Sequence, residues 1–190
     1  MARALRVEYE GARYHVMCRG NHGQRIFESQ DDADLFTKTL GEVCVRNGLV
    51  VHAWCLMGNH YHLLLETPLG NLVSAMKWFQ GTFTQRYNAR HQLWGHLFQG
   101  RYKAKLIDVE GGSYFRAVGD YIHLNPADAG LVGQGKLADW PWSSYPLYLC
   151  APSKRPKWLG VGDMLSACGI PNDSPSGRRA YAAYMDLRQQ

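Results

Sequence analysis

The sequence predicts an α+β protein built on a ferredoxin-like antiparallel sheet, in the order β-α-β-β-α-β, followed by a further helix and an irregular basic tail. Three observations support this prediction. Short β-prone segments alternate with long stretches whose apolar residues recur at helical spacing. The two central strands are joined by the tight-turn dipeptide Gly58-Asn59, which is typical of a β-hairpin. With 190 residues, the chain is long enough to bury the core of one ordinary domain.

The first strand and helix of the predicted core have clear boundary signals. Residues 13–19 form a short β-prone run, and the Gly-Asn-His-Gly sequence after it indicates a turn. Ser29 is followed three residues later by Asp32, which is the form of a capping box at the start of a helix. Apolar residues then recur at helical spacing until Asn47-Gly48, where the helix is expected to end.

The second half of the core continues from the hairpin. Residues 49–57 and 60–66 are its two predicted strands, and a Pro-Leu-Gly sequence ends the second one. Apolar and aromatic residues at helical spacing then predict a long amphipathic helix over about 70–90. A fourth strand is predicted over 102–109, which completes the antiparallel sheet.

A third helix and a tail follow the predicted sheet. The sequence Gly111-Gly-Ser113 opens the helix, and Pro126 marks its last turn or end, because proline disfavours helical geometry in the residue before it. We divide the chain into a core domain, residues 1–133, and an aromatic and basic C-terminal extension, residues 134–190, that packs partly on the core. A last short helix is expected over 178–190.

The composition argues against a membrane-spanning or disulfide-rich protein. Mean hydropathy is −0.34, and no apolar stretch approaches the ~20 residues that a membrane helix needs. Acidic residues interrupt the N-terminal segment where a signal peptide would be apolar, so we expect a cytoplasmic protein without a membrane partner. The five cysteines are scattered without a Cys-x-x-Cys pair, which indicates neither a disulfide framework nor a structural zinc site.

Basic residues gather in two places. The net charge of +5 favours a polyanionic partner. Three cations and a tyrosine lie within residues 99–105, and three arginines flank the first predicted strand. Cations bind phosphates while aromatic rings stack on bases, so we expect these side chains to contact nucleic acid, a solubilising surface being the alternative. The residues are Arg13, Arg19, Arg25, Arg101, Tyr102, Lys103 and Lys105.

Two histidines one residue apart, His60 and His62, open the third predicted strand. Side chains alternate across a strand, so residues i and i+2 emerge on the same face. Two neutral imidazoles there can share one divalent metal ion, and an additional oxygen ligand would favour Mg²⁺ or Mn²⁺. The alternative is a polar pair on a solvated strand face, although the run from Leu56 to Leu65 is more apolar than such a strand would be.

Tyr121 and Asn125 lie four residues apart in the third predicted helix, so they share one helix face. Asn125 offers a carbonyl oxygen as a third metal ligand, and Tyr121 offers a phenolic oxygen as a nucleophile toward a phosphate. A phosphotyrosine ester conserves the energy of the cleaved bond, which suits cutting and rejoining of nucleic acid. Tyr114, on the same face, is a rival nucleophile, and a core role for Tyr121 is the structural alternative. Other histidines, including His15, have no partner spacing and receive no role.

Several ordered motifs over residues 5–148 resemble one family, the single-tyrosine HUH transposases, and within it the REP-associated tyrosine transposases. The His-x-His segment is similar to the metal-binding motif of HUH endonucleases, and the segment around Tyr121 is similar to the catalytic-helix signature of the family. The motifs are Arg19-Gly-Asn-His-Gly-Gln-Arg-Ile-Phe27, Gly58-Asn-His-Tyr-His-Leu-Leu64, Phe98-Gln-Gly-Arg-Tyr-Lys-Ala-Lys105, Asp120-Tyr-Ile-His-Leu-Asn-Pro126 with Ala129-Gly-Leu-Val132, and Trp140-Pro-Trp-Ser-Ser-Tyr145.

The resemblance implies a metal-dependent endonuclease and strand transferase that acts on single-stranded DNA carrying a hairpin. His60, His62 and Asn125 would bind the divalent metal, Mg or Mn, in a ferredoxin-like catalytic domain. Tyr121 would attack a DNA phosphate, giving a 5′-phosphotyrosine link and a free 3′-hydroxyl. The protein would be a monomer or a homodimer. Two other functions stay open: a non-catalytic hairpin-binding regulator, and a metal-dependent phosphodiesterase without a covalent intermediate.

Overall fold

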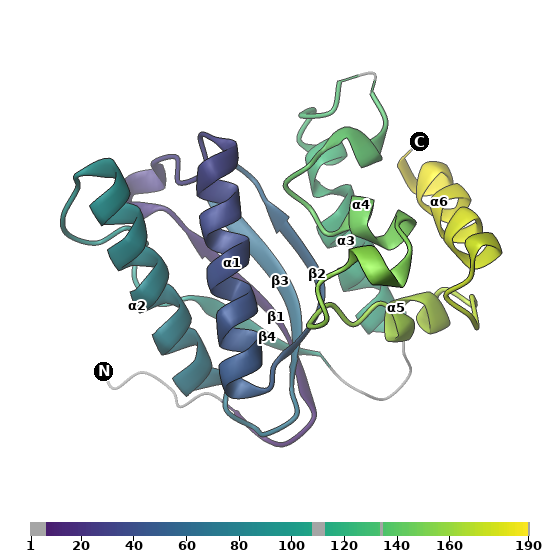
Figure 1. The fold of residues 1–190 in the computed structure, drawn as a ribbon, viewed down its shortest axis with the longest axis horizontal. Coiled ribbons are helices and arrows are strands. Elements are labelled where there is room, and N and C mark those ends of the chain that lie inside the picture. Colours follow the sequence, from purple (N-terminus) through teal and green to yellow (C-terminus); the bar gives the residue numbers. More distant parts are fainter. Residues whose placement is uncertain (1–6, 108–112, 134, 190) are drawn as a thin grey trace.

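The computed structural model describes residues 7–107, 113–133 and 135–189. These residues form an antiparallel sheet with helices on both faces (Figure 1). Helices α1 and α2 cover one face, and α3 with the helices of the C-terminal tail covers the other (Figure 1). No helix within the described ranges has the length and apolar character that a membrane crossing requires.

The sheet has the strand order β2-β3-β1-β4, which is the ferredoxin-like order that the sequence predicts. Its strands are β1 (Ala12–Arg19), β2 (Val50–Leu56), β3 (His60–Thr67) and β4 (Lys103–Ile107). All neighbouring pairs are antiparallel, so the α+β prediction is confirmed. The fourth strand is shorter than predicted, and the last two residues of its predicted range lie outside the described residues.

Helices α1 (Gln30–Asn47) and α2 (Leu72–His91) form one layer against the sheet. The Ser29 hydroxyl accepts a hydrogen bond from the backbone N–H of Asp32 at 3.3 Å, which completes the predicted capping box. Gly48 ends α1 in the left-handed conformation, with φ of 66°, which glycine adopts without steric cost. Tyr61 of β3 points into this layer, and its ring contacts that of Phe36.

Helix α3 (Ser113–Asp128) packs on the opposite face, against β2 and β3. Pro126 lies in its last turn, as the sequence predicts. Along α3, Phe115 contacts His52 of β2, and Tyr121, almost two turns later, contacts His62 of β3. The helix therefore runs along the hairpin toward the end of the sheet that carries His60.

The tail holds more helix than its sequence indicates: η2 (Leu137–Asp139), α4 (Tyr145–Leu149), η3 (Pro152–Lys154), α5 (Gly162–Ala167) and α6 (Pro175–Gln189). Two stretches of it follow the outer edge of β2. The carbonyls of Trp142 and Trp158 accept hydrogen bonds from Leu56 N–H and Val51 N–H. Helix α6 then closes over α3, where the Tyr184 hydroxyl donates to the buried Asp120 carboxylate.

Candidate active site

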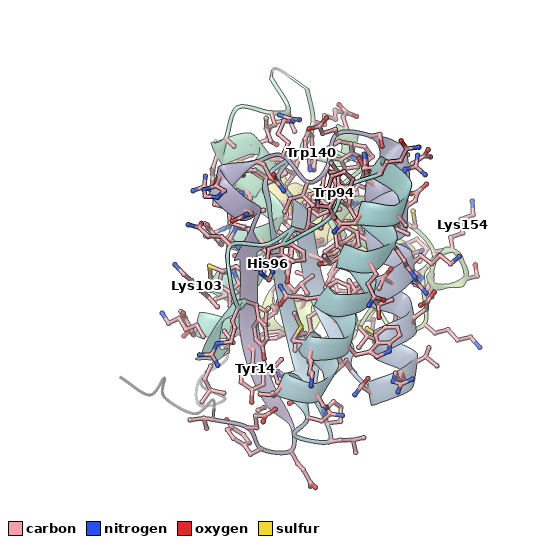
Figure 2. The ribbon with its side chains drawn as sticks, turned by 90° about the vertical axis from the view of Figure 1, so that its left-hand side faces the viewer. Tyr14, Trp94, His96, Lys103, Trp140 and Lys154 are labelled. Carbon is pink, nitrogen blue, oxygen red and sulfur yellow. The ribbon has the colours of Figure 1, made fainter. Side chains whose placement is uncertain are left out.

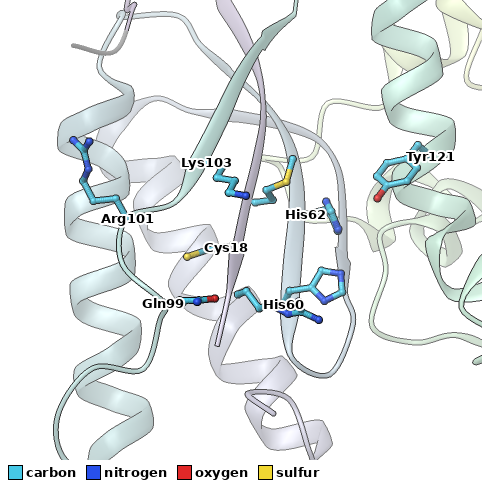
Figure 3. A pocket seen from close by; sticks show the side chains of 9 residues that line it. Cys18, His60, His62, Gln99, Arg101, Lys103 and Tyr121 are labelled. Carbon is cyan, nitrogen blue, oxygen red and sulfur yellow. The ribbon is translucent and has the colours of Figure 1, made fainter. Parts of the chain in front are cut away.

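A cavity of about 380 Å³ lies where the ends of β1 and β3 meet α3. Its lining includes the His60 and His62 imidazoles and the Tyr121 phenol. Figure 3 shows Tyr121 projecting from α3 toward His62, with Lys103 and Arg101 on the other side of the two histidines. The structure thus brings together in one cavity two of the three predicted metal ligands, His60 and His62, and the predicted nucleophile; Asn125, the third predicted ligand, is not among the described residues that line it.

The strand register explains how β3 places both histidines in this cavity. His60 pairs with Arg19 and His62 pairs with Met17 across the β1–β3 ladder, so both side chains emerge on the face toward α3. Their ring centroids lie 5.0 Å apart. His62 is buried and His60 is partly buried, so the solvated-face alternative does not hold for this pair.

The hydrogen bonds of the two histidines leave one nitrogen of His62 without a partner. Nδ1 of His60 lies 2.7 Å from Oδ1 of Asn59, and Nδ1 of His62 lies 2.9 Å from Nε2 of His15. Nε2 of His62 is buried and has no hydrogen-bond partner among the described residues. An unpartnered buried nitrogen beside a second imidazole fits a ligand to a divalent transition-type metal ion.

Burial also keeps these imidazoles neutral. Burial, followed by electrostatic interaction with His15 and His60, lowers the pKa of His62 to about 3. Burial and the Arg19 charge likewise lower the pKa of His60. Burial together with the Lys105 charge lowers the pKa of His15 to about 4. Neutral imidazole is the form that binds metal, so the site needs no deprotonation step at neutral pH.

Tyr121 is accessible, with 46% of its surface exposed, and its ring meets His62 edge-on at 5.5 Å between centroids. The rival Tyr114 lies beside Lys105, whose Nζ sits 4.8 Å from the centroid of the Tyr114 ring. Tyr121 lines the cavity and Tyr114 does not, which favours Tyr121 as the nucleophile. Asn125 follows one turn later; its Nδ2 donates to the Tyr121 carbonyl at 3.4 Å, which leaves its Oδ1 as an acceptor.

The residues predicted to contact nucleic acid fall into different environments. Arg19, Arg101 and Lys103 line the cavity, and Lys103 projects into solvent from β4 (Figure 2). Lys105 and Arg25 are exposed outside the cavity lining. Lys105 lies over the Tyr114 ring, and the Arg25 guanidinium lies beside Gly58. These cations give the cavity a positive rim that suits phosphates.

Two other residues of the predicted set are engaged elsewhere. Tyr102 is buried in the core with 6% of its surface exposed, so its ring cannot stack on a base in this conformation. Arg13 forms ion pairs with Glu66 and Asp163 and lies over the Phe115 ring. Phe115 lies almost two turns before Tyr121 on α3, so Arg13 is displaced from the cavity.

A second group of ligand-type side chains surrounds Arg13. His52, Glu66 and Asp163 bring one ligand atom each to within 4.8 Å of one another. The Arg13 guanidinium already binds both carboxylates, and His52 lies 3.3 Å from the same Glu66 oxygen. In this ion cluster the charged groups are paired with one another, and the Arg13–Asp163 pair joins α5 to the sheet. Nε2 of His62, by contrast, has no hydrogen-bond partner within the residues that the structure describes.

Sequence reasoning missed His15. It lies 47 residues before His62 in the chain, and only the β1–β3 register brings the two side chains into contact. The alternation of side chains along β1 does place His15 and Arg19 on one face, but the neighbouring strand was not identifiable from that signal alone.

The chain matches a family model and several solved structures. The family model described as "Transposase IS200 like" matches residues 8–125. The structure of a REP-associated tyrosine transposase bound to a REP hairpin is similar, with a TM-score of 0.64 and 18% identity over 84% of this chain and 92% of that one. A transposase-like crystal structure from Deinococcus radiodurans gives a TM-score of 0.44 and 20% identity over 57% of this chain and 88% of that one. No curated protein matches the chain.

Proposed function

Because this chain belongs to the IS200-like transposase family, we propose that it is a metal-dependent endonuclease and strand transferase for single-stranded DNA. The observation that carries the proposal is the cavity itself. It holds the Tyr121 phenol beside two neutral imidazoles, one of which has a buried nitrogen with no hydrogen-bond partner in the described part of the chain. A rim of cations completes a site suited to a phosphodiester.

Tyr121 is the proposed nucleophile. Its phenolic oxygen attacks a DNA phosphorus, the bond to the 3′-oxygen breaks, and the departing strand leaves as a free 3′-hydroxyl after taking up a proton. The product is a 5′-phosphotyrosine ester, which conserves the energy of the broken bond. A 3′-hydroxyl then attacks this ester, restores the phosphodiester and releases the tyrosine, so rejoining requires no nucleotide cofactor.

His60, His62 and Asn125 are the proposed ligands of a Mg²⁺ or Mn²⁺ ion, which when bound withdraws charge from the scissile phosphate. The direction of α3 supports Asn125 as the third ligand. Tyr121 contacts His62, and Asn125 follows one turn later as α3 runs on toward the His60 end of β3. Its Oδ1 is left available because Nδ2 donates to the helix backbone.

The proposed substrate is single-stranded DNA that carries a hairpin of the REP type. Arg19, Arg101 and Lys103 bind its backbone at the cavity rim, and Arg25 and Lys105 extend the contact. The solved relative was bound to a REP hairpin, which motivates this choice of DNA. The protein acts as a monomer or a homodimer, and within one chain β3 and α3 supply the two histidines and the tyrosine of one cavity.

The test is formation of a covalent adduct. Wild-type protein incubated with labelled hairpin single strands and Mg²⁺ or Mn²⁺ is expected to give a band that survives denaturation. Tyr121→Phe removes the attacking oxygen and should abolish this band, whereas Tyr114→Phe, on the same helix, should retain it. An adduct that persists in Tyr121→Phe would refute the assignment. Binding without an adduct in wild type would favour a hairpin-binding regulator, and cleavage without an adduct would favour a phosphodiesterase.

A further inference from the structure

A hydrogen bond joins His15 of β1 to His62 of β3. Nε2 of His15 lies 2.9 Å from Nδ1 of His62, and the two ring centroids are 5.1 Å apart. The two side chains are diagonal neighbours across the strand pair, since His15 pairs with Leu64 and Met17 pairs with His62. His15 is buried and also contacts the Tyr121 ring, with centroids 5.9 Å apart.

We propose that His15 is a positioning residue that fixes the tautomer and the orientation of His62. In this role it directs the lone pair of Nε2 of His62 to the divalent cation. The inference rests on the proposed function, because it takes His62 to be a metal ligand.

The argument follows from where the proton of His62 must be. A neutral imidazole carries one proton, and a nitrogen that binds a cation carries none, so that proton belongs on Nδ1. Nδ1–H then donates to Nε2 of His15, and His15 carries its own proton on Nδ1. The reverse arrangement places a buried N–H at Nε2 of His62, which has no acceptor among the described residues, and such an orphaned donor is unfavourable.

The other predicted ligand has an equivalent partner. Oδ1 of Asn59 accepts a hydrogen bond from Nδ1 of His60 at 2.7 Å. Metal-binding histidines commonly donate their second ring N–H to an oxygen acceptor, and Asn59 follows that pattern. At His62 the acceptor is a nitrogen of the buried His15 imidazole, whose ring contacts both the His62 ring and the Tyr121 ring. One side chain therefore constrains both the metal ligand and the position of the nucleophile.

Two substitutions at His15 separate positioning from packing. His15→Gln keeps an acceptor near the place of Nε2, whereas His15→Leu keeps a similar volume and removes the acceptor. Titration of Mn²⁺ alone, followed by calorimetry without DNA, should show an affinity about 10–100-fold weaker for His15→Leu. His15→Gln should remain within a few-fold of wild type, and His96→Leu, which removes an exposed histidine, should bind as wild type does.

A second measurement needs neither metal nor a variant. Long-range proton–nitrogen NMR spectra of metal-free wild-type protein with isotope-labelled histidines should show the proton of His62 on Nδ1. Either a proton on Nε2 of His62, or unchanged Mn²⁺ affinity in His15→Leu, would overturn the proposal. Failure of the proposed function would appear differently, as the lack of a Tyr121 adduct with DNA. Neither of the two measurements on His15 and His62 contains DNA, so the two kinds of failure can be told apart.

Discussion

Nδ1 of His123 lies 2.9 Å from the Tyr181 hydroxyl oxygen, and this fully buried contact joins α3 to α6. The opposite nitrogen of the same ring lies 2.8 Å from the Ser144 hydroxyl oxygen. One imidazole thus connects the helix that carries Tyr121, the last helix of the chain and the aromatic Trp140–Tyr145 segment. The position of Tyr121 relative to the sheet consequently depends on residues far beyond it in the sequence.

Removal of the Tyr181 hydroxyl should destabilise the fold. In Tyr181→Phe, Nδ1 of His123 remains buried and loses its partner, which typically costs about 1–3 kcal/mol of unfolding free energy. Urea denaturation measures the loss. Leu187→Ala on the same helix serves as a control, because 72% of Leu187 is exposed and its truncation should change stability by less than about 0.5 kcal/mol. Equal stability of Tyr181→Phe and wild type would contradict the role of this contact.

The unfolding free energy of the metal-free protein should fall as the pH drops below the pKa of free histidine. Burial lowers the pKa of His123 and of His62 to about 3, and that of His15 to about 4. Below a pH of about 6.5 the unfolded chain binds protons at these side chains and the folded chain does not. Each therefore contributes a slope of up to about 1.4 kcal/mol per pH unit, with stability rising with pH. Urea denaturation between about pH 7 and pH 5 would test this sign, and a flat profile would contradict it.

Charge reversal at the cavity rim should weaken DNA binding and reduce its salt dependence. Arg101→Glu combined with Lys103→Glu removes two predicted phosphate contacts, so the slope of log affinity against log salt should fall by about 1.4 for single strands. Fluorescence anisotropy over a range of salt concentrations measures this slope. Lys38→Glu, on α1 across the sheet from the cavity, should leave it unchanged. An unaltered slope in the double variant would remove these two residues from the interface.

Glu66 should contribute stability that is lost only in strong acid. Hydrogen bonds from His52 and Arg13 lower its pKa to about 2. Its contribution is then complete above the ordinary carboxyl pKa of about 4.3 and disappears as the pH falls toward 2. Glu66→Gln should lower the unfolding free energy at neutral pH by about 1–3 kcal/mol and flatten its pH dependence in that acidic range. An unfolding free energy of Glu66→Gln equal to that of wild type at neutral pH would show that this ion cluster does not stabilise the packing of α5 on the sheet.

Local signals were sufficient to predict the sheet and the helices of the core. The capping box at Ser29, the glycine stop at Gly48 and the turn at Gly58-Asn59 all act within a few residues. Side-chain alternation also placed His60 and His62 on one face without knowledge of any neighbouring strand. These features depend on backbone geometry that each short segment specifies for itself.

Contacts between distant segments could not be predicted in this way. The pairing of His15 with His62 requires the β1–β3 register, and the pairing of Arg13 with Asp163 requires the fold of the tail. Burial of Tyr102 was missed for the same reason, since a tyrosine among cations is equally compatible with a surface and with the margin of a core. Of the tail, only the last helix was predicted, and α6 buries Tyr181 and Met185 one turn apart. The shorter helices lack such a pattern and depend on tertiary packing: α5 packs on α3, and α4 packs on α6.

The two edges of the sheet are protected from self-association by different means. Along β2, the tail occupies backbone groups through Trp142, Ser144, Trp158 and Gly160. Along β4, the short outer strand presents Lys103 and Lys105, whose charges oppose alignment with a like strand. A chain shortened to its first 133 residues would uncover the β2 edge, and aggregation by strand pairing would become a hazard. By covering the β2 edge, the extension opposes aggregation of the chain, and this role is separate from any contact with DNA.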